Sequence, residues 1–363
     1  MVNKKHLNYK MKYIILMLVC INIWSGLTEA AYEKSIEICK NPTPSQELTL
    51  KRILDDFSVK YNRSKCKQIY SFLSKKKNLG FLGQPSDELD LKPLSELIQI
   101  EELFLMGVDK LNISPLKELV HLKKLQLSAK ELSGKEVIRR FVHLRELELV
   151  HSNLKDIDFI GEFTFLKRIN LSNNSIVDIT KIGSYSNLKH LILSSNKISD
   201  ITVLGKLPKL ERLILLGNDI SDVTPITTAT NLSDLQLSKN KVQDISALAN
   251  LINLKELYID SNNIKNITPL SKLAKLKKLS LMTNNVKDIS TLKGLESLEY
   301  LNISYNQVEY IGPLVGMHAL SDLRVSGNPL KDCPSGEITW LENGVIKCEE
   351  GVVKAMTHCK DKK

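Results

Sequence analysis

A pair of aliphatic residues separated by one position recurs every 22 residues through most of this chain. Eleven such pairs follow one another without insertion, from Leu103 and Leu105 to Leu323 and Val325. In a chain that is 42% hydrophobic, filling all 22 positions by chance has odds on the order of 10⁻⁸. The period therefore belongs to the fold. One repeat of this length cannot bury its own aliphatic side chains, so successive repeats have to stack on one another.

The alternation within each pair has the period of a β-strand, which points every second side chain to the same face. We therefore expect one short strand per repeat, with successive strands stacked in parallel about 4.8 Å apart. Asn occurs three residues after the pair in eight repeats. Its amide can bond backbone groups that a turn leaves unpaired, so we interpret this row as scaffold. The row consists of Asn174, Asn196, Asn218, Asn240, Asn262, Asn284, Asn306 and Asn328.

The first three repeats depart from this pattern. They carry Val108, Lys130 and Ser152 where the Asn row would begin, so we expect less regular structure between residues 101 and 160. In the second repeat, Ser133 and Glu136 have the spacing of a capping box, which predicts a helical turn from that point.

The full repeat, LxxLxLxxNxIxDIxxLxxL, resembles the leucine-rich repeat family. It is most similar to the 22-residue subclass shared by bacterial internalins and the cytosolic phosphatase-regulator type. The resemblance covers about residues 79–330 and includes a twelfth, degenerate copy near Phe81. It implies an α/β solenoid, a horseshoe with a concave parallel β-sheet and short 3-10 or helical turns on the convex side.

The two ends of such a solenoid need capping. Residues 31–78 hold two helical patterns, one starting at Thr43 and Pro44 and one from about residue 64 to 75, and predict a helical N-terminal cap. Residues 331–363 are expected to form a small C-terminal cap containing cysteines. Cys39 and Cys66 are a candidate disulfide, with two free thiols as the alternative. The pairing of the C-terminal cysteines stays open, and these are Cys333, Cys348 and Cys359.

Residues 1–30 combine a basic start, an apolar run from Tyr13 to Trp24 and small residues ending at Ala30. This pattern is typical of a secretory signal peptide and predicts a secreted, periplasmic or cell-surface protein. A membrane anchor is the first alternative, but the run is shorter than the roughly 20 apolar residues that span a bilayer. Lipidation at Cys20 is the second, and Val19 disfavours it because a small residue normally precedes a lipidated cysteine. No later stretch is long and apolar enough to span.

Catalytic signatures do not stand out. The sequence has no HExxH, no Gly-rich phosphate loop ending in Lys-Ser/Thr, and no GxSxG. Residues 64–67 fit SxxK, a match that Lys-rich sequence produces by accident. Metal binding is disfavoured because no CxxC spacing occurs. We therefore expect a protein that is not an enzyme and has neither a metal nor a cofactor.

The residues that flank each aliphatic pair point out of the core on the concave face and are the expected binding surface. Two groups on it have the composition of protein-binding hot spots, although scattered surface hydrophobes are the alternative reading. The first group is Ile192, Ile214 and Leu216, beside Arg212. The second group is Tyr258, Lys278, Met282, Tyr300, Tyr305 and Arg324.

Charge on this face disfavours nucleic acid, because a phosphate-tracking surface needs a strong positive excess. The basic residues number six: Lys124, Arg168, Arg212, Lys239, Lys278 and Arg324. The acidic residues number seven: Glu102, Glu146, Glu148, Asp234, Glu256, Asp260 and Asp322. The expected partner is a protein, and the resemblance to internalins implies a host cell-surface protein. A glycan held by stacking on Tyr, or an envelope scaffold role, is the alternative.

Overall fold

The structure is a computed structural model that describes residues 29–333, 338–342, 345–348 and 351–353. The chain forms two compact units. The first comprises residues 1–153 and 158–166, and the second comprises residues 154–157 and 167–363. The sequence-based signal peptide falls almost entirely on residues 1–28, which lie outside the described residues.

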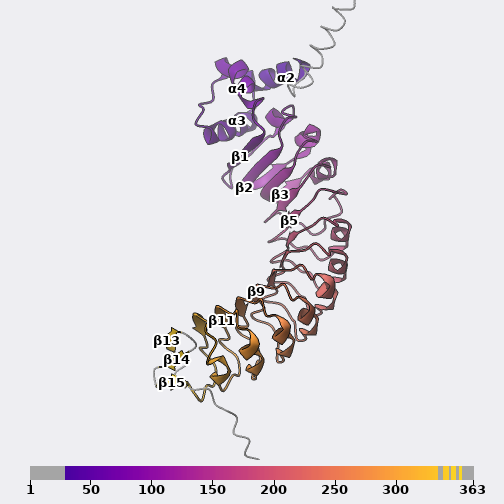
Figure 1. Ribbon diagram of the computed structural model, residues 1–363. Coiled ribbons are helices and arrows are strands. Elements are labelled where there is room, and N and C mark those ends of the chain that lie inside the picture. Colours follow the sequence, from indigo (N-terminus) through magenta and orange to yellow (C-terminus); the bar gives the residue numbers. More distant parts are fainter. Residues whose placement is uncertain (1–28, 334–337, 343–344, 349–350, 354–363) are drawn as a thin grey trace, which may run out of the picture. The chain divides into compact units, whose positions relative to one another are not determined.

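The first unit begins with helices and continues with parallel strands in sequence order (Figure 1). The helices are α2 (Glu29–Lys40), α3 (Pro44–Asp56) and α4 (Cys66–Leu73), with a 3-10 turn at Arg63–Lys65. The strands are β1 (Asn78–Leu82), β2 (Glu102–Asn112), β3 (Lys124–Ser133) and β4 (Glu146–Leu149).

The second unit holds eight three-residue parallel strands, again in sequence order. They are β5 (Arg168–Asn170), β6 (His190–Ile192), β7 (Arg212–Ile214), β8 (Asp234–Gln236), β9 (Glu256–Tyr258), β10 (Lys278–Ser280), β11 (Tyr300–Asn302) and β12 (Asp322–Arg324). A separate antiparallel sheet is formed by β13 (Ile338–Glu342), β14 (Val345–Cys348) and β15 (Gly351–Val353).

The core of each unit is built from the aliphatic pairs. In the second unit Leu257, Leu279 and Leu301 occupy the same register position on β9, β10 and β11, and all three are fully buried. A 3-10 turn follows each of these strands, for example Ser290–Gly294 after β10. The parallel-stranded α/β solenoid with short 3-10 turns is therefore confirmed.

The Asn row joins each repeat to the one before it. The Asn262 side chain accepts a hydrogen bond from the Val242 amide at 2.9 Å and donates to the Leu237 and Ile259 carbonyls at 3.0 and 3.1 Å. It is 7% exposed. The partners of Asn262 are therefore backbone groups of two successive repeats.

A second polar row caps the 3-10 turns. Asp244 Oδ1 accepts the Ser246 amide at 2.8 Å, and Asp178 accepts the Thr180 amide at 2.7 Å. Hydrogen bonds from the Thr180 hydroxyl and amide lower the pKa of Asp178. The recurrence of Asp-Ile in the sequence therefore reflects an Asx cap on the turn that follows.

The early repeats differ from the sequence-based expectation. Where the Asn row is missing, β2 and β3 continue as strands of 11 and 10 residues. The predicted capping box at Ser133 is wrong, because Ser133 is the last residue of β3. The N-cap of the 3-10 turn Lys135–Arg140 is Gly134, which has a φ of +67° and provides no side-chain cap. A residue with positive φ redirects the chain, so Ser133 cannot act as the N-cap.

The degenerate first repeat forms a strand of the sheet, β1, but its distance in sequence from the next repeat is not 22 residues. Leu79 and Phe81 on β1 align with Leu103 and Leu105 on β2, which is an offset of 24 residues. Leu79 and Phe81 are buried like the regular pairs. The two additional residues explain why the 22-residue period alone did not place the first strand.

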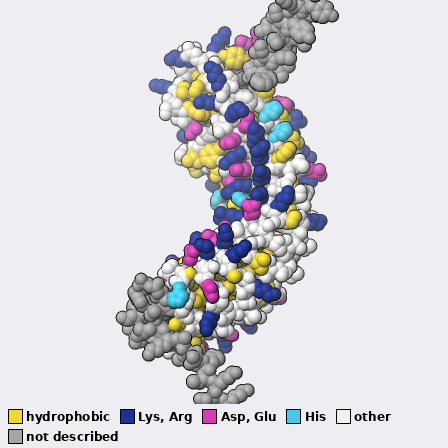
Figure 2. All heavy atoms as spheres, viewed as in Figure 1, with side chains coloured by type: hydrophobic (Ala, Val, Ile, Leu, Met, Phe, Trp, Pro, Cys, Tyr) yellow, Lys and Arg dark blue, Asp and Glu magenta, His cyan; other side chains and the backbone are white. Residues whose placement is uncertain are grey.

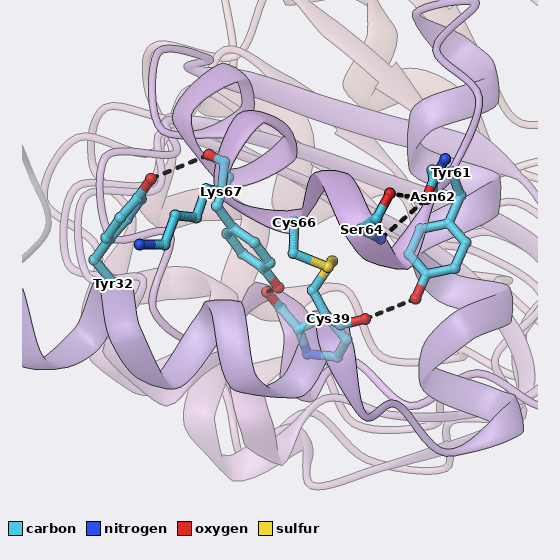
Figure 3. Close-up of a disulfide and its surroundings, with 9 residues drawn as sticks. Tyr32, Cys39, Tyr61, Asn62, Ser64, Cys66 and Lys67 are labelled. Atoms are coloured by element: carbon cyan, nitrogen blue, oxygen red, sulfur yellow. Dashed lines mark hydrogen bonds between the residues drawn. A yellow bond between two sulfur atoms is a disulfide. The ribbon is translucent and has the colours of Figure 1, made fainter.

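The N-terminal cap contains the predicted helix after Thr43, and both halves of its capping box with Gln46 are present. Helix α2 is an additional element that the sequence did not predict. Figure 3 shows the Cys39–Cys66 disulfide, which confirms the expected pairing and ties α2 to the start of α4. The Tyr61 hydroxyl donates to the Cys39 carbonyl at 2.7 Å and holds the intervening segment. Cys333 is disulfide-bonded as well.

Glu101 provides a pH-dependent contribution to the first unit. Its carboxylate bonds the ammonium groups of Lys123 and Lys77, which lowers its pKa from 4.5 to about 2. The folded state therefore binds this proton less readily than the unfolded state. The stabilisation is fully present above pH 4.5 and is lost as the pH falls toward 2.

We expect Glu101→Gln to cost about 1 kcal/mol at neutral pH, since the two lysines are exposed and screened. Urea unfolding of both proteins across this pH range measures the difference, which should vanish near pH 2. A constant difference over the range would show that the charge of Glu101 does not carry the effect.

Candidate functional site

The binding surface expected from the sequence lies on the strands of the second unit, and the register decides which residues meet. One row across β9 to β12 contains Glu256, Lys278, Tyr300 and Asp322 as direct neighbours. The parallel row, two positions further along each strand, begins with Tyr258 on β9 and ends with Arg324 on β12. Neighbouring side chains in such rows lie close enough to interact.

Arg324 and Tyr300 form the centre of this surface. The Arg324 guanidinium carbon lies 5.3 Å from the centroid of the Tyr300 ring, which is the geometry of a cation–π contact. Two nitrogens of Arg324 also bond the two carboxylate oxygens of Asp322, each at 3.2 Å. The hydrogen bond that Arg324 donates to Asp322, followed by the nearby Tyr300, raises the pKa of Arg324. The guanidinium is thus held in place while its side chain stays exposed.

Lys278 and Tyr258 continue the surface on β9 and β10. Lys278 Nζ lies 2.9 Å from Glu256 Oε1, and this hydrogen bond raises the pKa of Lys278. Partial burial, followed by the charge of Glu256, raises the pKa of the Tyr258 hydroxyl. The Tyr258 hydroxyl therefore stays protonated at neutral pH and can donate a hydrogen bond to a partner.

Met282 and Tyr305 follow the ends of β10 and β11. The Met282 amide donates to Asp260 Oδ1 at 2.8 Å. Tyr305 is 57% exposed and has a φ of +57°. A Cβ at Gly327 would lie 2.5 Å from Tyr305 Cδ1, so the ring rests on the glycine of the next repeat. We call Tyr258, Lys278, Met282, Tyr300, Tyr305 and Arg324 the tyrosine–arginine cluster.

The aliphatic group on β6 and β7 is less exposed than the sequence indicated. Ile214 is only 8% exposed and belongs to the buried residues, whereas Ile192 and Leu216 are half-buried. Ile214 lies in register between Ile192 on β6 and Gln236 on β8. Arg212 beside it pairs with Asp234 at 3.0 Å. Burial raises the pKa of Asp234 despite this pairing.

The acidic neighbours of the tyrosine–arginine cluster entered the sequence-based prediction only through the charge count of the face. Glu256 and Asp322 in fact orient Lys278 and Arg324. The 22-residue spacing from Glu256 to Lys278 was the available signal for the first pair, and the two-residue spacing from Asp322 to Arg324 for the second. In Figure 2 basic and acidic side chains are interspersed on the face in view.

Two properties of the described part of the chain bear on other kinds of site. It has no helix that is both long and apolar enough to cross a membrane. It also has no group of three or more His, Cys, Asp or Glu side chains arranged to hold a metal ion.

Comparison with known families agrees with this geometry. A model described as leucine-rich repeats in two copies matches residues 186–228, 230–272 and 252–294. A second leucine-rich repeat model matches residues 274–330. Residues 186–330 therefore consist of leucine-rich repeats. No curated protein matches its sequence.

Solved structures of bacterial leucine-rich repeat proteins resemble the chain. An internalin of Listeria monocytogenes, InlF, is 28% identical, with a TM-score of 0.67, over 72% of this chain and 84% of the internalin. A leucine-rich repeat protein of Leptospira interrogans is 21% identical, with a TM-score of 0.56, over 83% of this chain and 88% of its own. The functional domain of InlJ from Listeria monocytogenes is 14% identical, with a TM-score of 0.53, over 80% and 76%. The last two likenesses concern the fold alone.

Proposed function

We propose that this leucine-rich repeat protein is an exported, non-catalytic binding module that holds a protein partner on the strand face of its second unit. The tyrosine–arginine cluster is the centre of the site. One observation carries the proposal. Arg324 on β12 lies over the ring of Tyr300 on β11, and the exposed Tyr305 follows β11 in the sequence. Tyr and Arg are the residue types that dominate binding energy at protein interfaces.

Preorganisation supports the same proposal. Asp322 and the Tyr300 ring fix the Arg324 side chain, and Glu256 fixes Lys278, so a partner would order these long side chains at little further entropic cost. The short strands hold their backbones in one register. Ile192, Leu216 and Arg212, with Ile214 beneath them, would extend the contact along β6 and β7.

Export rests on two features. Residues 1–30 have the pattern of a signal peptide, and the Cys39–Cys66 disulfide is the kind of bond that persists in an oxidising compartment. The similarity to an internalin supports an adhesin or host-interaction role. Finding that the cellular protein retains residues 1–30 and stays in the cytosol would contradict export.

The double variant Tyr300→Ala/Tyr305→Ala tests the proposed site. Truncating two hot-spot rings should weaken binding of the captured protein partner on the order of 100-fold, since each costs roughly 1.4 kcal/mol or more. Surface plasmon resonance on the purified pair measures the change. Tyr310→Ala is the matched control, because Tyr310 is 42% exposed and carries Lys331 at 5.5 Å but lies outside the strands.

Each result has a clear meaning. Loss of binding in the double variant with retention in Tyr310→Ala supports the site. Equal affinity of all three proteins would remove the tyrosine–arginine cluster from the interface.

A second candidate, glycan recognition, is favoured by the open face of the Tyr305 ring, which could stack on a sugar. A glycan array run beside the protein capture separates the two functions. Glycan binding that the double variant loses, with no protein captured by the wild type, would replace the proposed function. An envelope scaffold role predicts a partner that the double variant still binds.

A further inference from the structure

A cavity on the strand face of the first unit is separate from the tyrosine–arginine cluster. Its volume is about 290 Å³, close to the lower limit of about 300 Å³ for ligand sites. That size suits one side chain rather than a cofactor. The floor is formed by β1, β2 and β3, and one wall by the end of α3 with Asp56 and Phe57.

Gly80 on the floor of the cavity lets Phe104 approach β1 closely. It neighbours Phe104 on β2, which in turn neighbours Gln126 on β3. A Cβ at position 80 would lie 2.6 Å from the Phe104 carbonyl oxygen and 2.7 Å from the Phe104 Cβ. The bare backbone of Gly80 therefore lets the half-buried Phe104 lie against β1, where it lines the cavity.

The charges that line the cavity are not balanced. Asp56 and Glu102 are exposed, and neither has an ion pair within the described residues. The basic residue of the lining, Lys124, is already paired with Glu146 at 3.2 Å. A cationic guest would therefore meet two unneutralised carboxylates.

The Phe57 ring, which also lines the cavity, is in contact with a cation. Lys76 Nζ lies 4.4 Å from the Phe57 ring centroid and 4.3 Å from that of Phe72. Aromatic faces combined with carboxylates are the surroundings that bind ammonium and guanidinium groups. Lys76 adds one positive charge near the wall, but the lining itself keeps its negative excess.

We propose that this cavity is an anchor pocket for an arginine or lysine side chain of a protein partner. The guest's charged group lies between Asp56 and Glu102, and its aliphatic stem lies along Phe104. This is a second contact site, in a different unit from the tyrosine–arginine cluster. Each site can therefore fail its own test without deciding the other.

The test uses the full chain and five pools of fluorescein-labelled nonapeptides. The central residue of each pool is fixed as Arg, Lys, Gln, Glu or Leu, and the flanking residues are drawn from Gly, Ser, Ala and Thr. Fluorescence anisotropy should show the Arg and Lys pools binding on the order of tenfold more tightly than the Gln pool. Asp56→Asn/Glu102→Gln should abolish that preference.

The control variant is Asp55→Asn/Glu131→Gln, which removes the same charge from the same unit. Asp55 lines a different cavity beside Tyr61, and Glu131 pairs with Lys110 on the surface. This variant should keep the preference. Phe104→Leu, which stays apolar and folded, should weaken Arg binding severalfold. The proposal is overturned if the pools bind equally, if none binds, or if the control variant loses the preference together with the Asp56 and Glu102 variant.

Discussion

Replacing Asn262 by Ala should lower the free energy of unfolding by about 3 kcal/mol, since one unpaired buried amide costs roughly 1–3 kcal/mol and each further lost hydrogen bond about 1 kcal/mol. The change leaves the Val242 amide without its acceptor. The Leu237 and Ile259 carbonyls each lose one of two side-chain donors, because Asn240 still bonds the first and Asn284 the second. The site is 7% exposed, so water cannot replace the amide. Urea unfolding followed by circular dichroism measures the loss.

Asn263→Ala is the control for this prediction. Asn263 is the adjacent residue and is exposed, and its backbone amide, which bonds the Val242 carbonyl at 2.9 Å, is unchanged by the substitution. We expect a change within about 0.5 kcal/mol. Similar effects of the two substitutions would contradict the scaffold role of the Asn row.

The double variant Cys39→Ser/Cys66→Ser should destabilise the N-terminal cap by about 3 kcal/mol. The bond closes a loop over a sequence separation of 27, and removing it returns that conformational freedom to the unfolded chain. The variant is preferable to a reducing agent, because Cys333 is also disulfide-bonded. Hydrogen exchange of α2 and α4 amides measures the loss within the first unit.

The second unit provides the internal comparison for the disulfide. Amides of β9 to β11 should exchange at the same rate in the variant and the wild type, because the bond lies in the first unit. If α2 exchange were unchanged, packing rather than the disulfide would hold the cap.

Most of the fold could be predicted from the sequence because one physical requirement repeats. Each Leu pair needs neighbours above and below it, and each turn needs its Asn, so a regular spacing implies both the strand and its register. The helix after Thr43 was likewise predicted from local signals, an N-cap residue followed by a first-turn proline, Pro44. Each of these signals depends on residues close together in the sequence, and its recurrence in successive repeats strengthens the prediction.

The remaining features depend on contacts between distant parts of the chain. The long strands β2 and β3 arise where Asn is absent, and the sequence predicts only that the turn is weakened there. Burial of Ile214 depends on its neighbours, whereas the periodicity assigned only the direction of its side chain. The pairing of Arg324 with both Asp322 and Tyr300 needs the register of β11 and β12, and the cavity at Gly80 needs α3 placed beside β1.

Hydrogen–deuterium exchange on the isolated complex of the chain with its protein partner tests the central claim most directly. If the strand face of the second unit is the binding surface, partner binding should slow exchange in residues 256–260, 278–282, 300–305 and 322–326. The 3-10 turns Thr268–Lys272 and Ser290–Gly294 should exchange as they do in the free protein. Protection confined to those turns, with the four strand segments unchanged, would contradict the account.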